Sequence, residues 1–321
     1  MKRKVLVCGA TGFIGRNVAE RLAKRDDVEV YGTYFKSKPL GGERIRMIRA
    51  DLTDARDVNE IIEGMDVIIQ AAATTSGAKD IVTRPYIHVT DNAVMNSLIF
   101  RAAHEHGAEH VLFFSCTVMY PSSDRPLKEG DFDANAAMHA NYFGVGWTKV
   151  YIEKMCEFYS RIGPAKYTAI RHSNVYGPYD KYDLERSHCF GATVAKVMGA
   201  PPGGGITVWG DGTEERDLMH VADLASFVET AVDRQEAKFE LLNAGLGSSI
   251  AVRDLVKKVI GHSGRELKIS YDASKPSIKT RLRLDVSKAK KKIGWEPRFS
   301  LDEGIKSALK WYRDNIGAAR Q

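Results

Sequence analysis

Cysteines are few in this chain of 321 residues, and no two of them lie close together. Zinc sites and disulfide frameworks use cysteines at defined short spacings, so we expect neither a metal site nor a disulfide frame. The thiols are predicted to be reduced, which favours a cytoplasmic location. The four positions are Cys8, Cys116, Cys156 and Cys189.

Long apolar runs are also absent, and we expect no membrane span. The chain opens on Met-Lys-Arg-Lys, but the apolar stretch that follows is a short predicted strand ended by Gly9, so we expect no signal peptide. The net charge of +6 is spread along the chain except at 288–292. We interpret that basic run as the solvated face of a helix and expect no nucleic-acid partner. Nucleic-acid binding by this run is the alternative.

Glycine, by contrast, is concentrated in the segment Gly9-Ala-Thr-Gly-Phe-Ile-Gly15, between a Val/Leu strand and a predicted helix over 13–24. Gly9 would allow a tight turn, Gly12 would let backbone N–H groups approach a diphosphate, and Gly15 would let the helix pack close to the strand. The segment therefore predicts a dinucleotide site, with an ordinary strand-to-helix turn as the alternative. The residues expected to line the site are Gly9, Thr11, Gly12, Phe13, Ile14 and Gly15.

The second predicted strand, 28–34, lacks the acidic residue that would accept hydrogen bonds from the adenosine ribose of NAD. Lys36 and Lys38 follow it, and their charges would suit a 2′-phosphate. We therefore favour NADP over NAD, although lysines that only aid solubility are the plainer interpretation. After the strand at 66–70, the small residues Ala71, Ala72 and Ala73 would let a cofactor lie across the strand ends.

Strands and helices alternate throughout the first half of the chain, with long helices predicted over 85–106 and about 146–161. This alternation predicts an α/β fold with a doubly wound parallel sheet, the Rossmann arrangement, and ligands at the carboxyl ends of the strands. Beyond residue 178 the alternation fades. We expect a smaller mixed α/β lobe there.

Several separated motifs together resemble the extended short-chain dehydrogenase/reductase family, which includes NAD-dependent epimerases and dehydratases of nucleotide sugars. The resemblance covers nearly the whole chain, and within the family it is strongest to the epimerase-reductases of a GDP-linked 4-keto-6-deoxy sugar. The motifs are Gly9-Ala-Thr-Gly-Phe-Ile-Gly15, Asp51-Leu52, Ser115-Cys-Thr-Val-Met-Tyr-Pro121, Lys149, Asn174-Val-Tyr-Gly-Pro178 and Arg216-Asp-Leu-Met-His-Val-Ala-Asp-Leu224.

The resemblance implies a role for each matching residue. Lys149 would hydrogen-bond the nicotinamide ribose, and Asn174 would meet the sugar or its diphosphate. Lys196 and Arg216 would bind the diphosphate as cations. His188 would reprotonate carbon beside a ketone, with a capping role as the alternative. Further contacts are implied for Asp51 and Leu52 with the cofactor, and for Tyr142, Trp209 and Arg281 with the substrate.

Three of the four proton-handling groups of the resembled family are changed here. The catalytic tyrosine four residues before Lys149 is replaced by Val145, and the cysteine used for epimerisation is replaced by Val118. The serine or threonine of the family falls on Cys116, with Thr117 beside it. Tyr142 precedes Lys149 by seven residues, and we expect it to lie out of phase on the helix.

Three explanations of these changes remain open. In the first, which we favour, Cys116, Tyr120, Tyr142 or His188 supplies the proton and cofactor redox survives; a cationic neighbour can bring a thiol into the required pKa range. In the second, the enzyme only shifts protons beside an existing ketone. In the third, the chain binds a nucleotide sugar without converting it. The expected function is epimerisation, reduction or dehydration of a nucleotide-linked sugar, with GDP as the favoured nucleotide.

The resemblance also bears on domains and assembly. We expect a dinucleotide-binding lobe over 1–178, joined by about 217–245, and a nucleotide-sugar lobe over 179–216 and 246–321. The helices at about 85–106 and 146–161 are expected to pair two copies into a homodimer. Apolar residues at 150, 152, 155, 156 and 159 exceed what one face packed on the sheet would need, although internal packing would also explain them.

Overall fold

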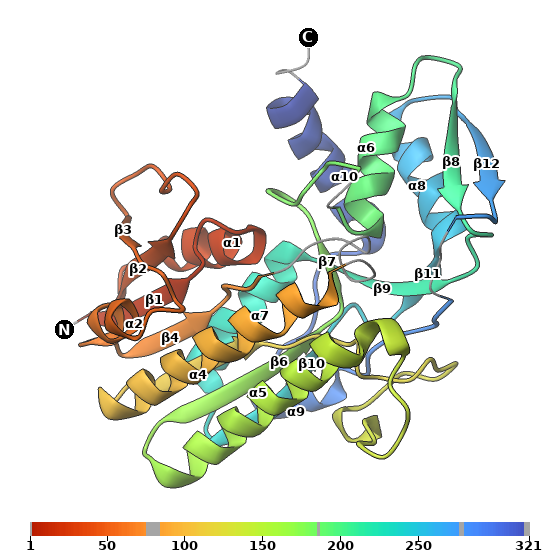
Figure 1. Ribbon diagram of the computed structural model, residues 1–321. Helices are drawn as coiled ribbons and strands as arrows, with labels where there is room; N and C mark the ends of the chain where they lie inside the picture. The colour runs from red at the N-terminus through yellow and green to blue at the C-terminus, as the bar shows by residue number, and fades with distance from the viewer. Residues whose placement is uncertain (1, 75–83, 185–186, 276–278, 318–321) are drawn as a thin grey trace.

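The computed structural model describes residues 2–74, 84–184, 187–275 and 279–317. Its centre is a seven-stranded sheet in the order β10-β6-β5-β4-β1-β2-β3, in which every neighbouring pair is parallel. The expectation of a doubly wound parallel sheet is thus confirmed (Figure 1). The strands are β1 (Arg3–Cys8), β2 (Val28–Tyr34), β3 (Ile45–Arg49), β4 (Val67–Gln70), β5 (His110–Phe114), β6 (Lys166–His172) and β10 (Phe239–Ala244).

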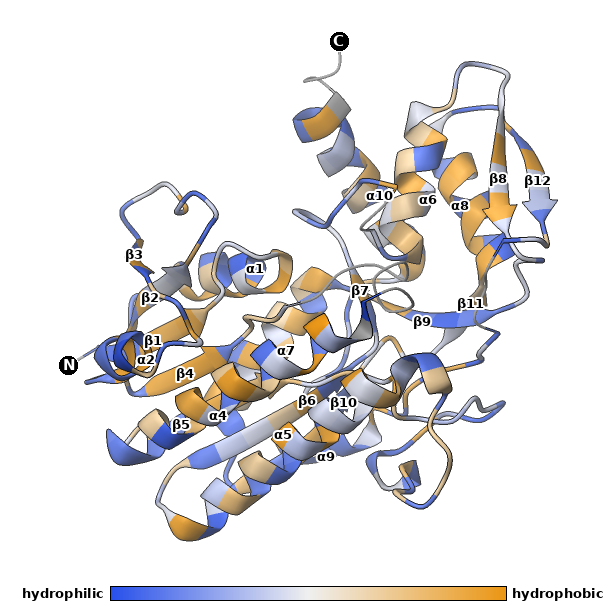
Figure 2. Ribbon diagram, viewed as in Figure 1, coloured by the Kyte–Doolittle hydropathy of each residue, from blue (hydrophilic) through white to orange (hydrophobic). Residues whose placement is uncertain are grey.

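Helices cover both faces of this sheet because its strands are apolar on both sides. Along β1, Val5 and Val7 point into one core and Leu6 and Cys8 into the other. One core is closed by α1 (Phe13–Leu22), α7 (Val221–Arg234) and α9 (Ser287–Ile293), and the other by α2 (Ala55–Ile62), α4 (Thr90–Glu105) and α5 (Phe143–Ile162). Figure 2 shows the hydrophobic colouring concentrated in central strands such as β4.

The second half of the chain adds a smaller mixed lobe, as expected. It holds a third apolar core and two small sheets, β11-β9-β7 and β12-β8. The elements are β7 (Asn174–Tyr176), α6 (Cys189–Gly199), β8 (Gly205–Trp209), β9 (Glu215–His220), β11 (Ser249–Ala251), α8 (Val252–Ser263), β12 (Lys268–Asp272) and α10 (Leu301–Tyr312), which a π-helical turn (Arg313–Gly317) extends.

The two long helices differ in detail from their predicted bounds. The first begins with a 3₁₀ turn (Pro85–His88) before α4, and a 3₁₀ turn (Ala140–Tyr142) leads directly into α5. Helix α5 therefore starts three residues earlier than expected. A further short 3₁₀ turn (Glu129–Asp131) lies in the segment before it. In Figure 1 the first residues of α5 lie toward β9, and its last residues lie beside the start of β6.

Two surface features bear on the expected partners. The basic run at 288–292 lies on α9, where Lys288 and Lys292 both pair with Glu240, at 3.1 and 3.2 Å. Glu240 is buried on β10, so these two lysines tie α9 to the sheet rather than only facing solvent. Within the described ranges, no helix is long and apolar enough to cross a membrane.

Candidate functional site

The glycine-rich turn between β1 and α1 has the geometry that a dinucleotide needs. Gly9 has φ +73°, and a Cβ there would stand 2.7 Å from the Cα of Ala72. A Cβ on Gly15 would overlap the carbonyl oxygen of Gly9, so only glycine lets α1 start this close to the turn. Thr33, buried at the end of β2, accepts a hydrogen bond from the Gly9 amide at 2.8 Å.

Gly12 plays a different part, because it is exposed and serves as the N-cap of α1 without a side-chain cap. A Cβ on Gly12 would meet only the Gly9 carbonyl oxygen, at 3.3 Å, and would otherwise project into open space. The amides of the first turn are therefore left for an anion, and the helix dipole favours negative charge at the same place. A dinucleotide diphosphate fits this cradle.

Basic and polar side chains gather beyond β2, where the adenosine ribose would lie. The Lys36 ammonium stands 5.2 Å from the centre of the Phe35 ring, and the Arg49 guanidinium stands 5.7 Å from it. The Thr11 and Ser37 hydroxyls are hydrogen-bonded at 2.7 Å. The sequence reasoning found Lys36 but missed Arg49, which ends a different strand, β3.

The remaining predicted cofactor contacts lie at the same ends of the strands. Asp51 accepts hydrogen bonds from the Thr53 amide and hydroxyl, and Leu52 is buried. Ala71 and Ala72 are half-buried and Ala73 is exposed, which leaves shallow space beyond β4. Asp54, one of two residues expected to cap α2, accepts the Arg56 amide at 2.8 Å.

Lys149 on α5 and Cys116 after β5 form the floor of the site. The Lys149 ammonium donates to the Phe114 carbonyl at 2.7 Å and lies 4.7 Å from the Phe113 ring centre. Burial lowers the pKa of Lys149, and the nearby Cys116 and Glu153 raise it. Burial raises the pKa of the Cys116 thiol, while Lys149 lowers it. Lysine and thiol are thus electrostatic partners, with Thr117 next in the chain and half-buried.

A buried polar network supports this floor, and sequence reasoning did not find it. Arg171 on β6 makes two hydrogen bonds to Glu153 on α5, at 2.7 and 2.9 Å, and Ser115 donates to the same carboxylate at 2.6 Å. Arg171 also donates to the Tyr120 hydroxyl at 3.0 Å, and Tyr120 donates to Asn243 at 2.8 Å. The Tyr120 phenol is fully engaged, and burial raises its pKa to about 12. We therefore drop Tyr120 as a proton source.

Tyr142 lies closer to this floor than expected. Seven residues at about 100° each return to within about 20° of the starting direction, so Tyr142 and Lys149 share a helix face. The expectation that Tyr142 is out of phase is wrong. Its phenol interacts electrostatically with both Cys116 and Arg216, and burial raises its pKa while Arg216 lowers it. Val145 and Val118, half-buried, offer no proton.

Two histidines border the floor on the other side. His172, the last residue of β6, donates from Nδ1 to the Ser173 carbonyl at 2.8 Å, and burial lowers its pKa to about 4. Both Lys149 and His188 contribute to that lowering. His188 itself is exposed immediately before α6, makes no capping bond, and has a pKa lowered by the protein around it and by Lys181.

The predicted substrate cations come from the second lobe. Lys196 on α6 donates to the Thr207 carbonyl at 2.8 Å and lies 5.5 Å from the Trp209 ring centre. Arg216 on β9 donates to the Thr280 hydroxyl at 2.8 Å. Arg216 and Lys196 both lower the pKa of Cys189, so both cations lie near this residue at the start of α6.

Asn174 and Arg281 occupy different settings. Asn174 is half-buried on β7, which pairs with β9 beside Arg216. Arg281 is exposed and pairs with Asp124 at 2.8 Å and with Glu215, the neighbour of Arg216, at 3.7 Å, so its charge is already engaged by the protein. Within the described ranges, no group of three or more His, Cys, Asp or Glu residues is placed to hold a metal ion.

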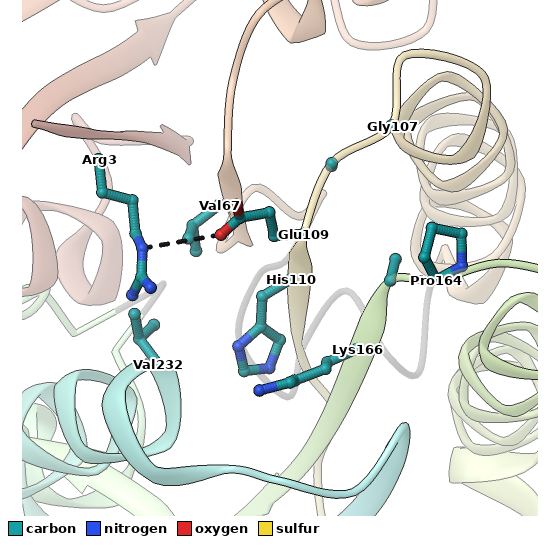
Figure 3. Close-up of a pocket in the computed structure, with 10 residues that line it drawn as sticks. Arg3, Val67, Gly107, Glu109, His110, Pro164, Lys166 and Val232 are labelled. Carbon is teal, nitrogen blue, oxygen red and sulfur yellow. Dashed lines mark ion pairs between the residues drawn. The ribbon is translucent and has the colours of Figure 1, made fainter. Parts of the chain in front are cut away.

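A separate hollow of about 270 Å³ lies at the amino ends of the strands, away from this site (Figure 3). Arg3, His110 and Lys166 line it, at the starts of β1, β5 and β6. Lys166 donates to the Gln235 carbonyl at 2.8 Å, and the His110 ring is hydrogen-bonded to Thr168 at 2.7 Å. Their polar groups are used by the protein, so we do not treat the hollow as the site.

Comparisons with known proteins agree with this geometry. Residues 5–245 match the sequence model of the NAD dependent epimerase/dehydratase family. The chain is 27% identical to GDP-L-fucose synthase of Escherichia coli (strain K12), over 98% of each chain, and 26% identical to GDP-L-colitose synthase of Yersinia pseudotuberculosis, over 96% and 97%. A solved UDP-glucose 4-epimerase from Thermotoga maritima superposes with a TM-score of 0.86 at 22% identity, covering 98% of this chain and 99% of that one.

Proposed function

The chain belongs to the NAD dependent epimerase/dehydratase family, and from this premise we propose that it is an enzyme that modifies a nucleotide-linked sugar. The reaction class is epimerisation, reduction or dehydration with a bound nicotinamide dinucleotide. One observation carries the proposal: the anion cradle at Gly12 and the cations Lys196 and Arg216 come from the two lobes, and Tyr142, directly before α5, interacts electrostatically with both Arg216 and Cys116 of the floor. Two phosphorylated ligands would therefore meet there.

The substrate side favours a nucleotide diphosphate. Lys196 and Arg216 supply positive charge, and Arg216 can engage phosphate oxygens through its planar guanidinium. Asn174 is proposed as a further contact, and the indole of Trp209, 49% exposed, as a stacking surface for the nucleotide base. We propose GDP as the nucleotide, because relatives named GDP-L-fucose synthase and GDP-L-colitose synthase match over nearly the whole chain. We also propose Arg281 as a substrate contact, for which it must first break its ion pair with Asp124.

For the cofactor we propose NADP. The Gly12 cradle would hold the diphosphate, and Lys36 and Arg49 together offer two positive charges for a 2′-phosphate. The end of β2 carries no acidic residue that would bind the ribose hydroxyls of NAD. When bound, the dinucleotide supplies or accepts a hydride. Replacing Lys36 and Arg49 by alanine should then weaken NADP binding at least tenfold and leave NAD binding within twofold, as measured by calorimetry.

The chain's own residues have distinct tasks in this scheme. Lys149, held by the Phe114 carbonyl, would orient the cofactor ribose and, as a cation, lower the pKa of Cys116. Cys116 and Thr117 would border the reacting sugar. His188 would enter as a neutral imidazole at pH 7, because its pKa is lowered below the ordinary 6.5. It would then accept a proton more readily than donate one.

We further propose the lobe boundaries 1–178 with 217–245 and 179–216 with 246–321, across which β7 and β9 join the small sheet of the second lobe, and a homodimer through α4 and α5. The residues first used to support the dimer are largely internal, since Val150, Ile152 and Cys156 are buried. Other apolar residues support it better because they are exposed: Tyr86, Val94, Phe143, Tyr151, Phe158 and Ile162. Light scattering at micromolar concentration should give twice the monomer mass; the monomer mass would refute the dimer.

The reaction is tested by incubating the purified protein with GDP-4-keto-6-deoxymannose and NADPH, and separately with GDP-mannose, and identifying products by mass spectrometry. We expect a modified GDP-sugar together with oxidation of NADPH. A second candidate function, nucleotide-sugar binding without turnover, is favoured by the valines at 145 and 118. Binding without product across GDP-, UDP-, CDP- and dTDP-sugars would replace the enzyme assignment with that one.

A further inference from the structure

Tyr142 carries a phenol that the protein itself does not use. Its side chain is half-buried, and its hydroxyl has no hydrogen-bond partner among the described residues. The ring of His139 packs beside it at 5.5 Å, and the His139 Nδ1 accepts the Asn141 amide, which fixes the turn. A polar group held in place without a partner is suited to a ligand.

The position of Tyr142 relates it to the missing tyrosine of the family. Tyr142 and Lys149 lie on one face of α5, about 10 Å apart along the axis, whereas a four-residue spacing gives about 6 Å. Tyr142 directly precedes the first residue of α5, and this end of the helix lies toward β9, the strand that carries Arg216 (Figure 1). The phenol interacts electrostatically with both Cys116 and Arg216. Tyr142 is therefore near both the floor and the proposed diphosphate site.

We propose that Tyr142 is the catalytic acid of this enzyme, taking the place of the tyrosine that Val145 has removed. The inference rests on the proposed function. In the reductive direction, a reduced nicotinamide dinucleotide gives its hydride to the carbonyl carbon of the keto sugar. The Tyr142 O–H bond breaks and its proton passes to the carbonyl oxygen, so that an alcohol and a phenolate result. The phenolate regains a proton from the Cys116 thiol or from water.

The surroundings of Tyr142 suit an acid better than a base. Burial raises the pKa of its phenol and Cys116 raises it further, while Arg216 acts in the opposite sense. A protonated phenol at neutral pH can donate to a developing alkoxide, and Arg216 stabilises the phenolate that follows. Tyr120 does not compete, since Arg171 and Asn243 hold its hydroxyl.

The test compares Tyr142→Phe with Tyr271→Phe, a control on β12 whose side chain is exposed and belongs to neither the proposed site nor the proposed dimer interface. Single-turnover oxidation of NADPH with GDP-4-keto-6-deoxymannose should slow about 100-fold in Tyr142→Phe and remain within twofold in the control. The Kd for GDP should stay within twofold in both variants, because GDP lacks the sugar. The loss of rate at high pH, which reports phenol ionisation in the parent, should disappear in Tyr142→Phe.

A second variant separates loss of the phenol from any effect of Tyr142→Phe on folding or substrate binding. Adding Val145→Tyr to Tyr142→Phe should restore the rate at least tenfold, because the phenol returns to the position the family uses. A Tyr142→Phe rate within threefold of the parent, or an unchanged pH profile, would overturn the proposal while leaving the proposed function intact. A parent protein that binds GDP but converts no keto sugar would overturn the proposed function, and this inference with it.

Discussion

Replacing Glu153 by glutamine tests the buried network beneath the site. The Glu153 and Arg171 side chains are 5% and 3% exposed, and they share two hydrogen bonds, at 2.7 and 2.9 Å. Burial alone would lower the pKa of Arg171, but its bonds to Glu153 raise it, so the guanidinium stays charged. Glu153→Gln keeps the shape of the side chain and removes its charge. The variant leaves a buried guanidinium without a counter-ion.

The expected loss is about 3–5 kcal/mol of the free energy of unfolding, the range for breaking a buried ion pair on one side. Glu157, one turn further along α5, is the matched control: it pairs with Lys154 and Arg161 but is 24% exposed. Glu157→Gln should cost at most about 1 kcal/mol. Urea unfolding at pH 7, followed by circular dichroism, gives both values.

Removing both charges should reverse much of the loss. The double variant Glu153→Leu, Arg171→Met leaves no buried charge, so we expect it to be at least about 1 kcal/mol more stable than Glu153→Gln. It will still lack a partner for the Ser115 hydroxyl, and the Tyr120 hydroxyl will keep only its bond to Asn243. If Glu153→Gln costs no more than Glu157→Gln, the reasoning about the buried pair is refuted.

Three other predictions use the same structure. Gly12→Leu should abolish dinucleotide binding in calorimetry and keep the parent's melting temperature within about 2 °C, because its side chain projects into the cradle; unchanged affinity would remove the loop from the cofactor site. Cys116→Ser and Cys116→Ala should each lower turnover at least tenfold at pH 7–9 if the thiol returns the proton; near-full turnover in both would shift that task to water. His110 is buried, and its pKa is lowered to about 3. Its neutral form therefore contributes fully to stability at pH values above the unfolded-state pKa of about 6.5, and this contribution is lost as the pH falls toward 3. His110→Gln should therefore flatten the pH dependence of stability between pH 6.5 and 5 by up to about 1.4 kcal/mol per pH unit, and an unchanged slope in urea titrations would contradict this.

Local chemistry explains what the sequence could predict. The glycine turn, the parallel alternation and the bounds of β2 depend on neighbouring residues, and the structure agrees with each. The resemblance located Lys149, Lys196 and Arg216, which lie on α5, α6 and β9. These positions follow from short motifs.

What the sequence could not predict depends on contacts between distant elements. Glu153 lies on a helix and Arg171 on a strand, and the local sequence of neither segment predicts that they pair. Helix α5 is apolar on several sides, so the sequence could not separate the buried Ile152 from the exposed Phe158. Tyr142 was misplaced because a seven-residue separation was taken to be out of phase, although it returns to nearly the same face of a helix.

The central claim is that a nucleotide-linked sugar and a nicotinamide dinucleotide meet over Lys149 and Cys116. A crystal structure with NADP and a GDP-sugar bound tests it most directly. We predict the dinucleotide diphosphate at the amides after Gly12, the nucleotide diphosphate against Arg216, and the Tyr142 hydroxyl within hydrogen-bonding distance of a sugar oxygen. A sugar bound away from Lys149 and Cys116, or a dinucleotide bound elsewhere than the Gly12 turn, would contradict the account.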